Sequence, residues 1–335
     1  MAFKSCTSTP DMFDSFLATP PRNEVLKDLA RLVDWAALRK LVAPAYKSAD
    51  KGGAVGYDPI ILIKLLLLER LYQLSDVQVV EEAADRLSFR EFLGLRASDT
   101  VPDDTTLVVF RNRLRHCGLV EKIMKEIEAQ LRARGLAVRE GSIKMIDATL
   151  IEAAVNPPTK PKEEEAAPEP PLDPDADFTV RGDEVHYGYK AHLAQDRATG
   201  LVTEVVVTAA SVNDTVVFEE LLDGSEAEVL ADKGYDSAAN RAICAALGVK
   251  ASIMKKAAKN RPLSKWWRGR NKSIARVRNF IEGTPAQLKR YLGCGRAIYR
   301  GLVKTTEQIR WGVLAFNLRR AAALARGPSA SPARN

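Results

Sequence analysis

The sequence predicts an α/β fold, in which a mixed sheet with the element order β-β-β-α-β-α-β-α follows an all-α N-terminal domain. Three observations support it. Helical patterns fill residues 22–140, short β-prone runs begin at Ser142, and three such runs precede a regular alternation of strands and helices. We therefore expect a helical domain over residues 1–140, an α/β domain over 141–326 and a tail over 327–335.

The N-terminal domain centres on a run from Pro59 to Tyr72 that is apolar on nearly every side, as in a buried helix. A second helix is expected after Ser75. A third is expected to be capped at Asp104-Thr105-Thr106 and carries Arg111 and Arg113. Short capped helices with a basic one last are typical of a helix-turn-helix, and an ordinary helical bundle fits equally well. The domain is expected to bind DNA ends or to join subunits.

In the α/β domain the spacing of apolar residues changes from the helical pattern to the alternation that is typical of strands. Strands are expected at 143–150, 186–196, 201–209, 228–232 and 249–254, and the second and third form a hairpin around the turn 197–200. Helices are expected at 213–222, at 237–247 and around 273–282. A stretch rich in Pro, Glu and Ala at about 157–177 cannot bury a core. We expect it to be a disordered loop that interrupts the domain.

The charge is unevenly distributed. The net charge is +7, but residues 255–326 hold nineteen Lys and Arg against two acids. This imbalance favours a polyanion as partner, and nucleic acid is the first candidate; a solvated basic surface is the alternative. The four cysteines form no CxxC pair, and no signal peptide or membrane-spanning run is present. We expect a cytoplasmic, nucleoid-associated protein without a membrane partner.

Three carboxylates are candidates for the chemistry. Asp147 sits near the end of the first strand, Asp232 sits at the end of the fourth about 85 residues later, and Glu282 lies on a helix about 50 residues beyond. Carboxylates and water are the ligands that Mg²⁺ prefers, and two such ions about 4 Å apart serve phosphoryl transfer in nucleases and polymerases. With three histidines and no phosphate-binding glycine loop or nucleophile elbow, zinc or triad hydrolysis finds little support.

Several sequence blocks, in order, resemble the DDE transposases of bacterial insertion sequences, specifically the insertion sequence five group. They are Tyr57-Asp-Pro to Phe110-Arg-Asn-Arg-Leu, Ile146-Asp-Ala-Thr, Tyr187-Gly-Tyr-Lys-Ala-His and Ala231-Asp-Lys-Gly-Tyr-Asp. The resemblance covers roughly Gly56 to Arg320. It implies a ribonuclease-H-like catalytic core, with Asp147, Asp232 and Glu282 as catalytic and metal-binding residues.

The family pattern around the third acid is Tyr-x2-Arg-x3-Glu-x6-Lys. Arg278, Glu282 and Lys289 match it, whereas Ala275 stands at the tyrosine position. The resemblance implies that Arg278 and Lys289 hold phosphates, which positions DNA without reading its sequence. Arg278 and Glu282 are also spaced for a simple surface ion pair. Pro285 is expected to end or kink the helix before Lys289.

Further DNA contacts are expected in a basic, aromatic segment before the Glu282 helix. Lys265, Trp266, Trp267 and Arg268 lie in what the pattern indicates to be a loop. Adjacent aromatic rings in such a loop suit stacking on an unpaired base, although packing of one Trp into the core fits equally well. Arg111 and Arg113 complete the set of expected DNA-binding residues.

Together these features predict a transposase that binds terminal inverted repeats, frees a 3′-hydroxyl and joins it to target double-stranded DNA, using two Mg²⁺ ions for which Mn²⁺ substitutes. Because two ends must be joined, a homodimer or higher assembly is expected. A ribonuclease-H-like nuclease without strand transfer is one alternative. A domesticated DNA-binding protein that no longer catalyses is another.

Overall fold

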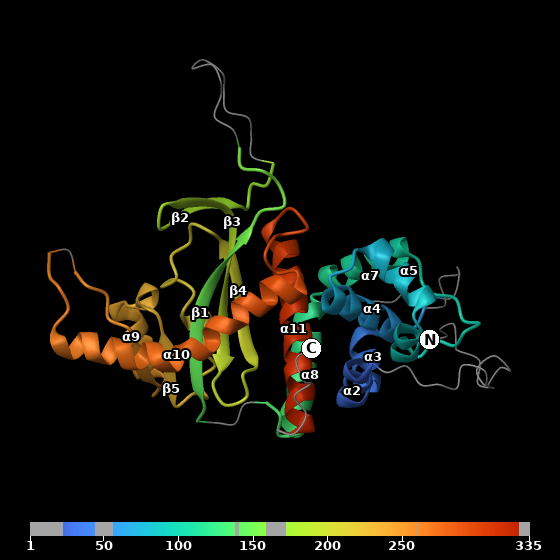
Figure 1. The fold of residues 1–335 in the computed structure, drawn as a ribbon, viewed down its shortest axis with the longest axis horizontal. Helices are drawn as coiled ribbons and strands as arrows, with labels where there is room; N and C mark the ends of the chain where they lie inside the picture. The colour runs from blue at the N-terminus through green and yellow to red at the C-terminus, as the bar shows by residue number, and fades with distance from the viewer. Residues whose placement is uncertain (1–22, 44–55, 138–140, 159–171, 259, 328–335) are drawn as a thin grey trace, which may run out of the picture. The chain divides into compact units, whose positions relative to one another are not determined.

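The computed structural model describes residues 23–43, 56–137, 141–158, 172–258 and 260–327. They belong to two compact units, one of residues 1–136 and 314–335, the other of residues 137–313. Figure 1 shows the helices of the first unit and the sheet of the second. Helix α11 (Leu302–Arg326) contributes its first half to the second unit and its second half to the first.

The first unit is helical throughout its described residues, as the sequence predicts. Its further helices are α2 (Glu24–Leu32), α3 (Trp35–Val42), α4 (Pro59–Tyr72), α5 (Asp76–Asp85), α6 (Leu87–Leu93), α7 (Asp104–His116) and α8 (Leu119–Ala133). Helix α4 forms the centre, because every residue from Pro59 to Arg70 is buried. Asp58 caps its first turn, and Pro59 stands where its missing N–H costs nothing.

Helices α5 and α7 begin at side-chain caps. Ser75 and Gln78 form a capping box at α5, and Asp103 accepts the Thr106 N–H at α7. The cap of α7 is thus one residue earlier than the sequence indicated. Asp104 occupies the first helical position, where an acid is stabilised by the helix dipole.

The second unit is built on a six-stranded mixed sheet. Its strands are β1 (Ile143–Glu152), β2 (Asp177–Arg181), β3 (Glu184–Asp196), β4 (Val202–Ala209), β5 (Glu228–Ala231) and β6 (Lys250–Ile253). Strand β3 pairs antiparallel with β1, β2 and β4, whereas β1 pairs parallel with β5 and β5 with β6. The mixed sheet and the helical N-terminal region confirm the predicted fold class.

Helices cover the two faces of this sheet. On one face Ile146, Val229 and Ile253 pack with residues from 3-10 helix η3 (Glu219–Leu221) and helix α9 (Ala238–Ala246). On the other face Met145 and Leu230 pack against Ile274 and Ile281 of helix α10 (Lys265–Leu292). Because side chains alternate along a strand, Asp147 shares the α10 face with Met145.

The helix expected at 213–222 does not form. The chain there runs through turns that end in η3. The Asn213 side chain accepts the Thr215 N–H, which favours a turn, and the β-branched run that follows is a weak helix former. Val217, Phe218 and Leu221 nevertheless bury their side chains in the core, so the apolar spacing reflected burial rather than a helix.

Most of the loop expected at 157–177 lies outside the described residues, but its end is ordered. Asp173 is fully buried and accepts hydrogen bonds from Tyr189 Oη (2.7 Å) and the Gly301 N–H (3.2 Å). Asp175 caps the start of α11 through the Leu302 N–H (2.8 Å). The sequence also missed β2, which is short and follows this polar stretch directly.

Helix α10 is longer than expected and continues through Pro285. The sequence indicated that Pro285 would end or kink the helix before Lys289. The helix does not end there, so that part of the expectation is wrong. Proline removes one backbone hydrogen bond, but packing offsets the loss. Pro285 is itself buried, between Ile281 and Leu288, and the buried Thr284 hydroxyl donates to Gln195 Oε1 (3.0 Å).

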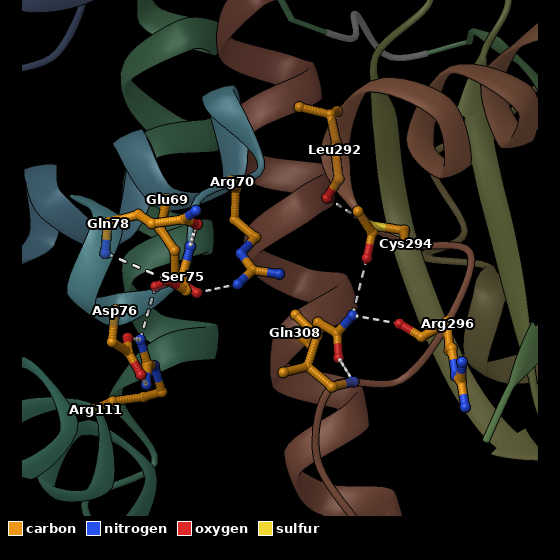
Figure 2. Close-up of polar contacts among 12 residues, drawn as sticks. Glu69, Arg70, Ser75, Asp76, Gln78, Arg111, Leu292, Cys294, Arg296 and Gln308 are labelled. Carbon is orange, nitrogen blue, oxygen red and sulfur yellow. Dashed lines mark hydrogen bonds and ion pairs between the residues drawn. The ribbon is translucent and has the colours of Figure 1, made fainter. Parts of the chain in front are cut away.

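The end of α10 is held by the first part of α11, as the right half of Figure 2 shows. Gln308 Nε2 donates to the carbonyls of Gly293 (2.9 Å) and Arg296 (2.8 Å), and its Oε1 accepts the Ile298 N–H (2.8 Å). These bonds satisfy backbone groups that a helix end leaves without partners.

Within the part of the chain that the structure describes, no helix has both the length and the apolar character needed to cross a bilayer.

Candidate active site

Asp147 and Asp232 meet because of the register between two parallel strands. Ile146 of β1 lies opposite Ala231 of β5, so the next residue on each chain is an aspartate. Strand β5 ends at Ala231, and Asp232 begins the 3-10 helix η4 (Lys233–Tyr235), with its Oδ1 accepting the Lys233 N–H (2.6 Å). The two predicted acids therefore lie side by side at the carboxyl end of β5, where α/β folds place ligands. Asp147 itself is the fifth of ten residues in β1, which continues to Glu152, so it lies in the middle of its strand and not near the end as the sequence indicated.

Arg278 of α10 faces this pair of aspartates. Its Nη2 lies 3.1 Å from Asp147 Oδ1, and its Nη1 lies 3.9 Å from Asp232 Oδ1. The Arg278 side chain is 7% exposed, and its Nε has no hydrogen-bond partner in the described structure. The sequence spacing allowed Arg278 to form a surface ion pair with Glu282. In the structure its guanidinium is instead buried beside Asp147.

The electrostatics of Asp147 reflect this crowding. Burial raises the pKa of the Asp147 carboxyl above its usual value; Arg278 opposes the rise, and Asp232 and Glu282 add to it. One arginine therefore does not compensate three neighbouring carboxylates. A site of this kind favours an additional positive charge.

Glu282 lies one turn beyond Arg278 on the same helix and is exposed. At 3.6 residues per turn, an unbroken helix places Arg278, Glu282 and Lys289 within about 40° of one another. Lys289 is partly buried, and burial lowers its pKa; Arg181 lowers it further, whereas Glu152 opposes both. The continuity of α10 through Pro285 is what gives the three residues a common face.

The carboxylates of the site match a divalent metal ion in chemistry but are not arranged around one. Within the described ranges, no three His, Cys, Asp or Glu side chains converge closely enough to hold an ion as they stand. Asp147 and Asp232 instead share Arg278, with Glu282 near enough to raise the pKa of Asp147. Hard carboxylate oxygens with uncompensated negative charge fit Mg²⁺ or Mn²⁺ in chemistry.

Two other acids close to the site have cationic partners of their own. Asp214 binds Lys190 (2.8 Å), and Asp236 binds Arg241 (2.7 Å). A Cβ on Gly234 would lie 2.7 Å from Asp214 Oδ2, so the Asp214 carboxylate would have to shift to admit a side chain there. These ion pairs give Asp214 and Asp236 structural roles.

Sequence reasoning did not identify a buried layer beneath the site. His192 Nδ1 lies 3.0 Å from Tyr235 Oη and its Nε2 3.4 Å from Thr208 Oγ1. Burial lowers the pKa of His192 to about 4, so the ring is neutral near pH 7. The sequence did indicate that His192 and Lys190 share one face of a strand, because they are two residues apart. It could not show their partners, which come from distant segments.

The tryptophan segment is helical rather than a loop. Lys265, Trp266, Trp267 and Arg268 form the first turn of α10, which Ser264 caps. Trp266 is 63% exposed and packs edge to face on Trp267, at 4.7 Å between ring centroids. Trp266 lies twelve residues before Arg278, roughly 18 Å along a helix. The segment is therefore accessible on the same helix as Arg278, but it is not adjacent to the carboxylates.

Arg111 and Arg113 differ in their surroundings, as the left half of Figure 2 shows for Arg111. Arg111 is buried and binds Glu69 (2.7 Å) and Asp76 (3.1 Å). Arg70 also pairs with Glu69, so this cluster joins helices α4, α5 and α7. Arg113 is partly exposed on α7. The structure thus gives Arg111 a structural role and leaves Arg113 accessible.

The chain matches two protein families. A family described as a transposase DDE domain matches residues 139–318, and one described as a transposase domain (DUF772) matches residues 14–113. Among solved structures, the chain is similar to a piggyBac transposase synaptic complex with hairpin DNA, determined by cryo-EM. The two share 11% sequence identity, with a TM-score of 0.43 over 93% of this chain and 75% of that chain.

Proposed function

Because the chain belongs to the family of transposase DDE domains, we propose that it binds the terminal inverted repeats of its own insertion sequence, cleaves the DNA ends and joins them to target DNA. The observation that carries this proposal is the juxtaposition of Asp147 and Asp232 under Arg278 at the carboxyl end of β5. The family normally uses divalent metal ions, and we propose two Mg²⁺ ions, with Mn²⁺ as a substitute.

Asp147 and Asp232 would hold the metal ions together with Glu282. When bound, the metal ions activate the attacking oxygen and stabilise the leaving oxygen of a phosphodiester displacement. The protein provides the rest by position. Asp147 is fixed within β1 and Asp232 at the end of β5, and Glu282 is carried by a helix packed on the same face of the sheet.

Arg278 and Lys289 would contact phosphates beside the scissile bond. Both lie on the face of α10 that carries Glu282, and a guanidinium suits the two oxygens of a phosphate. Arg278 would be available for the DNA backbone with Asp147 and Asp232 compensated by other cations. Such contacts position the strand without reading its sequence.

Trp266 and Trp267 would stack on bases at a cleaved end, with Lys265 and Arg268 on nearby phosphates. The exposure of Trp266 supports this role over packing into the core. In the first unit, Arg113 is the accessible candidate for a backbone contact. Arg111 is better explained by its ion pairs with Glu69 and Asp76.

In the first step, water attacks phosphorus, the bond from phosphorus to the 3′-oxygen breaks, and that oxygen leaves as a free 3′-hydroxyl. In the second step, this hydroxyl attacks a phosphorus of target DNA, forms the new phosphodiester and displaces a target 3′-oxygen. Both steps break and form one bond of the same type, so one site serves both.

The test uses duplexes that cover the ends of the encoding element, with Mg²⁺ and a plasmid target. We expect wild-type chain to nick the ends and to join pre-cleaved ends, and Asp232→Asn to lose both while still binding DNA. Glu220→Gln, at an exposed acid on η3, is the matched control and should retain both. Nicking without joining would favour a nuclease, and binding without either reaction would favour a regulator.

A further inference from the structure

Strands β2 and β3 form a two-stranded ribbon at one end of the sheet (Figure 1). In the described residues, β2 pairs with β3 alone, through five residue pairs from Asp177 opposite Gly188 to Arg181 opposite Glu184. The Phe178 N–H donates to the Asp177 carboxylate (2.7 Å) rather than to a neighbouring strand. The outer edge of β2 is therefore an open strand edge, which is a ready template for pairing with another chain.

One face of the ribbon is apolar and exposed. Phe178 lies opposite Tyr187, with ring centroids 4.8 Å apart, and Val180 lies opposite Val185. Phe178 is 42% exposed, Val180 68% and Val185 65%. Large apolar side chains that are both contiguous and exposed mark interaction surfaces more often than scattered ones do.

The charges of the ribbon argue against nucleic acid as its partner. Residues 177–188 contain Asp177, Asp183 and Glu184 against Arg181 as the only Lys or Arg. This is the opposite of the balance in residues 255–326. A net negative ribbon would be repelled by phosphates and fits a protein surface instead.

The sequence of β2, Asp-Phe-Thr-Val-Arg, is complementary to itself when two copies run antiparallel. With Thr179 on the two-fold axis, Asp177 of each copy faces Arg181 of the other, and Phe178 faces Val180. Opposite charges and aromatic with β-branched residues are the favourable cross-strand pairs in antiparallel sheets. A closed two-fold dimer requires this self-complementarity of one surface.

We propose that β2 is a homodimerisation edge, where two copies of the chain pair antiparallel about Thr179 and join their sheets into one. The two apolar faces then continue across the axis. The Ser211 hydroxyl and the Phe178 N–H lower the pKa of Asp177, so its carboxylate remains ionised for the partner's arginine. The interface would supply the second copy that joining two DNA ends needs, but it does not depend on the carboxylate site.

The test measures the mass of the full chain in solution, without DNA, by sedimentation over a concentration series. Wild type is expected to dimerise. Arg181→Asp and Asp177→Arg each place like charges opposite one another twice, which should weaken the dimer roughly 30-fold. Mixing the two variants restores both opposite-charge pairs, so a heterodimer with near wild-type affinity is expected. Asp183→Arg, in the turn outside the pairing, is the control and should leave the dimer intact.

A cross-link fixes the register independently. In paired antiparallel strands, facing Cα atoms lie about 4.5 or 5.5 Å apart, within the range of a disulfide. With Cys6 and Cys117 replaced by Ser, Thr179→Cys should form a disulfide-linked dimer on oxidation, whereas Val185→Cys should not. A monomeric wild type, unchanged mass of Arg181→Asp, or no rescue on mixing would each overturn the proposal. Because no DNA or cleavage enters the measurement, its failure leaves the proposed function untouched.

Discussion

Arg278 Nη2 lies 3.1 Å from Asp147 Oδ1, so a buried guanidinium and a partly buried carboxylate are directly paired within the candidate active site. Nη1 of the same side chain extends toward Asp232, at 3.9 Å. Arg278 is thus an internal counter-ion for two carboxylates that, in the proposed function, also hold metal ions. The ion pair and the metal ions should therefore compete.

This competition predicts the behaviour of Arg278→Gln. Without divalent ions, the loss of one partner from a buried pair should lower the free energy of unfolding by about 2–4 kcal/mol. Mn²⁺ should then raise the melting temperature of the variant more than that of wild type, because the carboxylates lack another cation. Thermal unfolding with and without Mn²⁺ measures both effects. Arg276→Gln, exposed on the same helix, is the control and should behave as wild type. Equal Mn²⁺ shifts in Arg278→Gln and wild type would refute the competition.

Gly188 should be intolerant of a side chain. Its φ is +152°, and a Cβ would lie 2.2 Å from the Ile151 carbonyl oxygen and 2.6 Å from the Ala153 nitrogen, both backbone atoms of the β1 segment. Gly188→Ala should lower the free energy of unfolding by about 4 kcal/mol. Gly182→Ala is the matched control: its φ is +64° but its surroundings are open, so the cost should be about 1 kcal/mol. Denaturant titration distinguishes the two, and similar costs at both positions would contradict the packing.

Substitutions of Arg111 and Arg113 should have different effects, the first on stability and the second on DNA binding. Arg111→Met leaves Glu69 and Asp76 short of a buried partner and should cost about 3–5 kcal/mol of stability. Arg113→Ala should change stability by less than about 0.5 kcal/mol. If Arg113 contacts a phosphate, its loss should weaken DNA binding similarly on all sequences and reduce the salt slope by about 1. Unchanged salt dependence would remove Arg113 from the DNA-binding surface.

The lowered pKa of His192 predicts that the folded protein loses stability in acid. Burial lowers its folded-state pKa to about 4, against about 6.5 when exposed, so the unfolded chain binds the proton more readily. The neutral ring makes its full contribution to the free energy of unfolding above pH 6.5. This contribution declines as the pH falls toward 4, by about 3 kcal/mol in all. His192→Gln should flatten the pH dependence of unfolding in this window. His186→Gln, at the less buried histidine of the same strand, should retain it. The same slope in both variants would contradict the assignment.

Much of this fold could be predicted because local pattern and burial agree. The alternation of β1, β3 and β4 identified three strands, and Asp232 was correctly identified as a strand end, whereas Asp147 lies in the middle of β1 rather than near its end. The register that joins them, Ile146 opposite Ala231, is a property of two distant strands and could not be derived from either alone. The family resemblance to DDE transposases supplied the expectation that both acids belong to one site, and family membership is now confirmed.

The errors have a common cause, because tertiary contacts overrode local signals. Pro285 does not end α10, since the flanking Ile281 and Leu288 are buried and Thr284 is bonded to Gln195. The run at 213–222 has helical spacing but packs as turns. The sequence spacing also allowed Glu282 as an ion-pair partner of Arg278, but the neighbour of Arg278 in space, Asp147, is 131 residues away.

Glu282 remains the least constrained of the three acids. It is exposed, and its link to the site in the described structure is its effect on the pKa of Asp147. The central claim is nevertheless that all three carboxylates hold the same metal ions. The claim therefore depends most on this residue.

The most direct test is Mn²⁺ binding by calorimetry to wild type and to Asp147→Asn, Asp232→Asn and Glu282→Gln, with DNA-end cleavage measured on the same samples. We predict that each substitution weakens Mn²⁺ binding at least tenfold and lowers cleavage by roughly 10³-fold, the scale of several kcal/mol of transition-state stabilisation. Glu220→Gln should retain both properties. Wild-type Mn²⁺ affinity and cleavage in Glu282→Gln would contradict the three-carboxylate site.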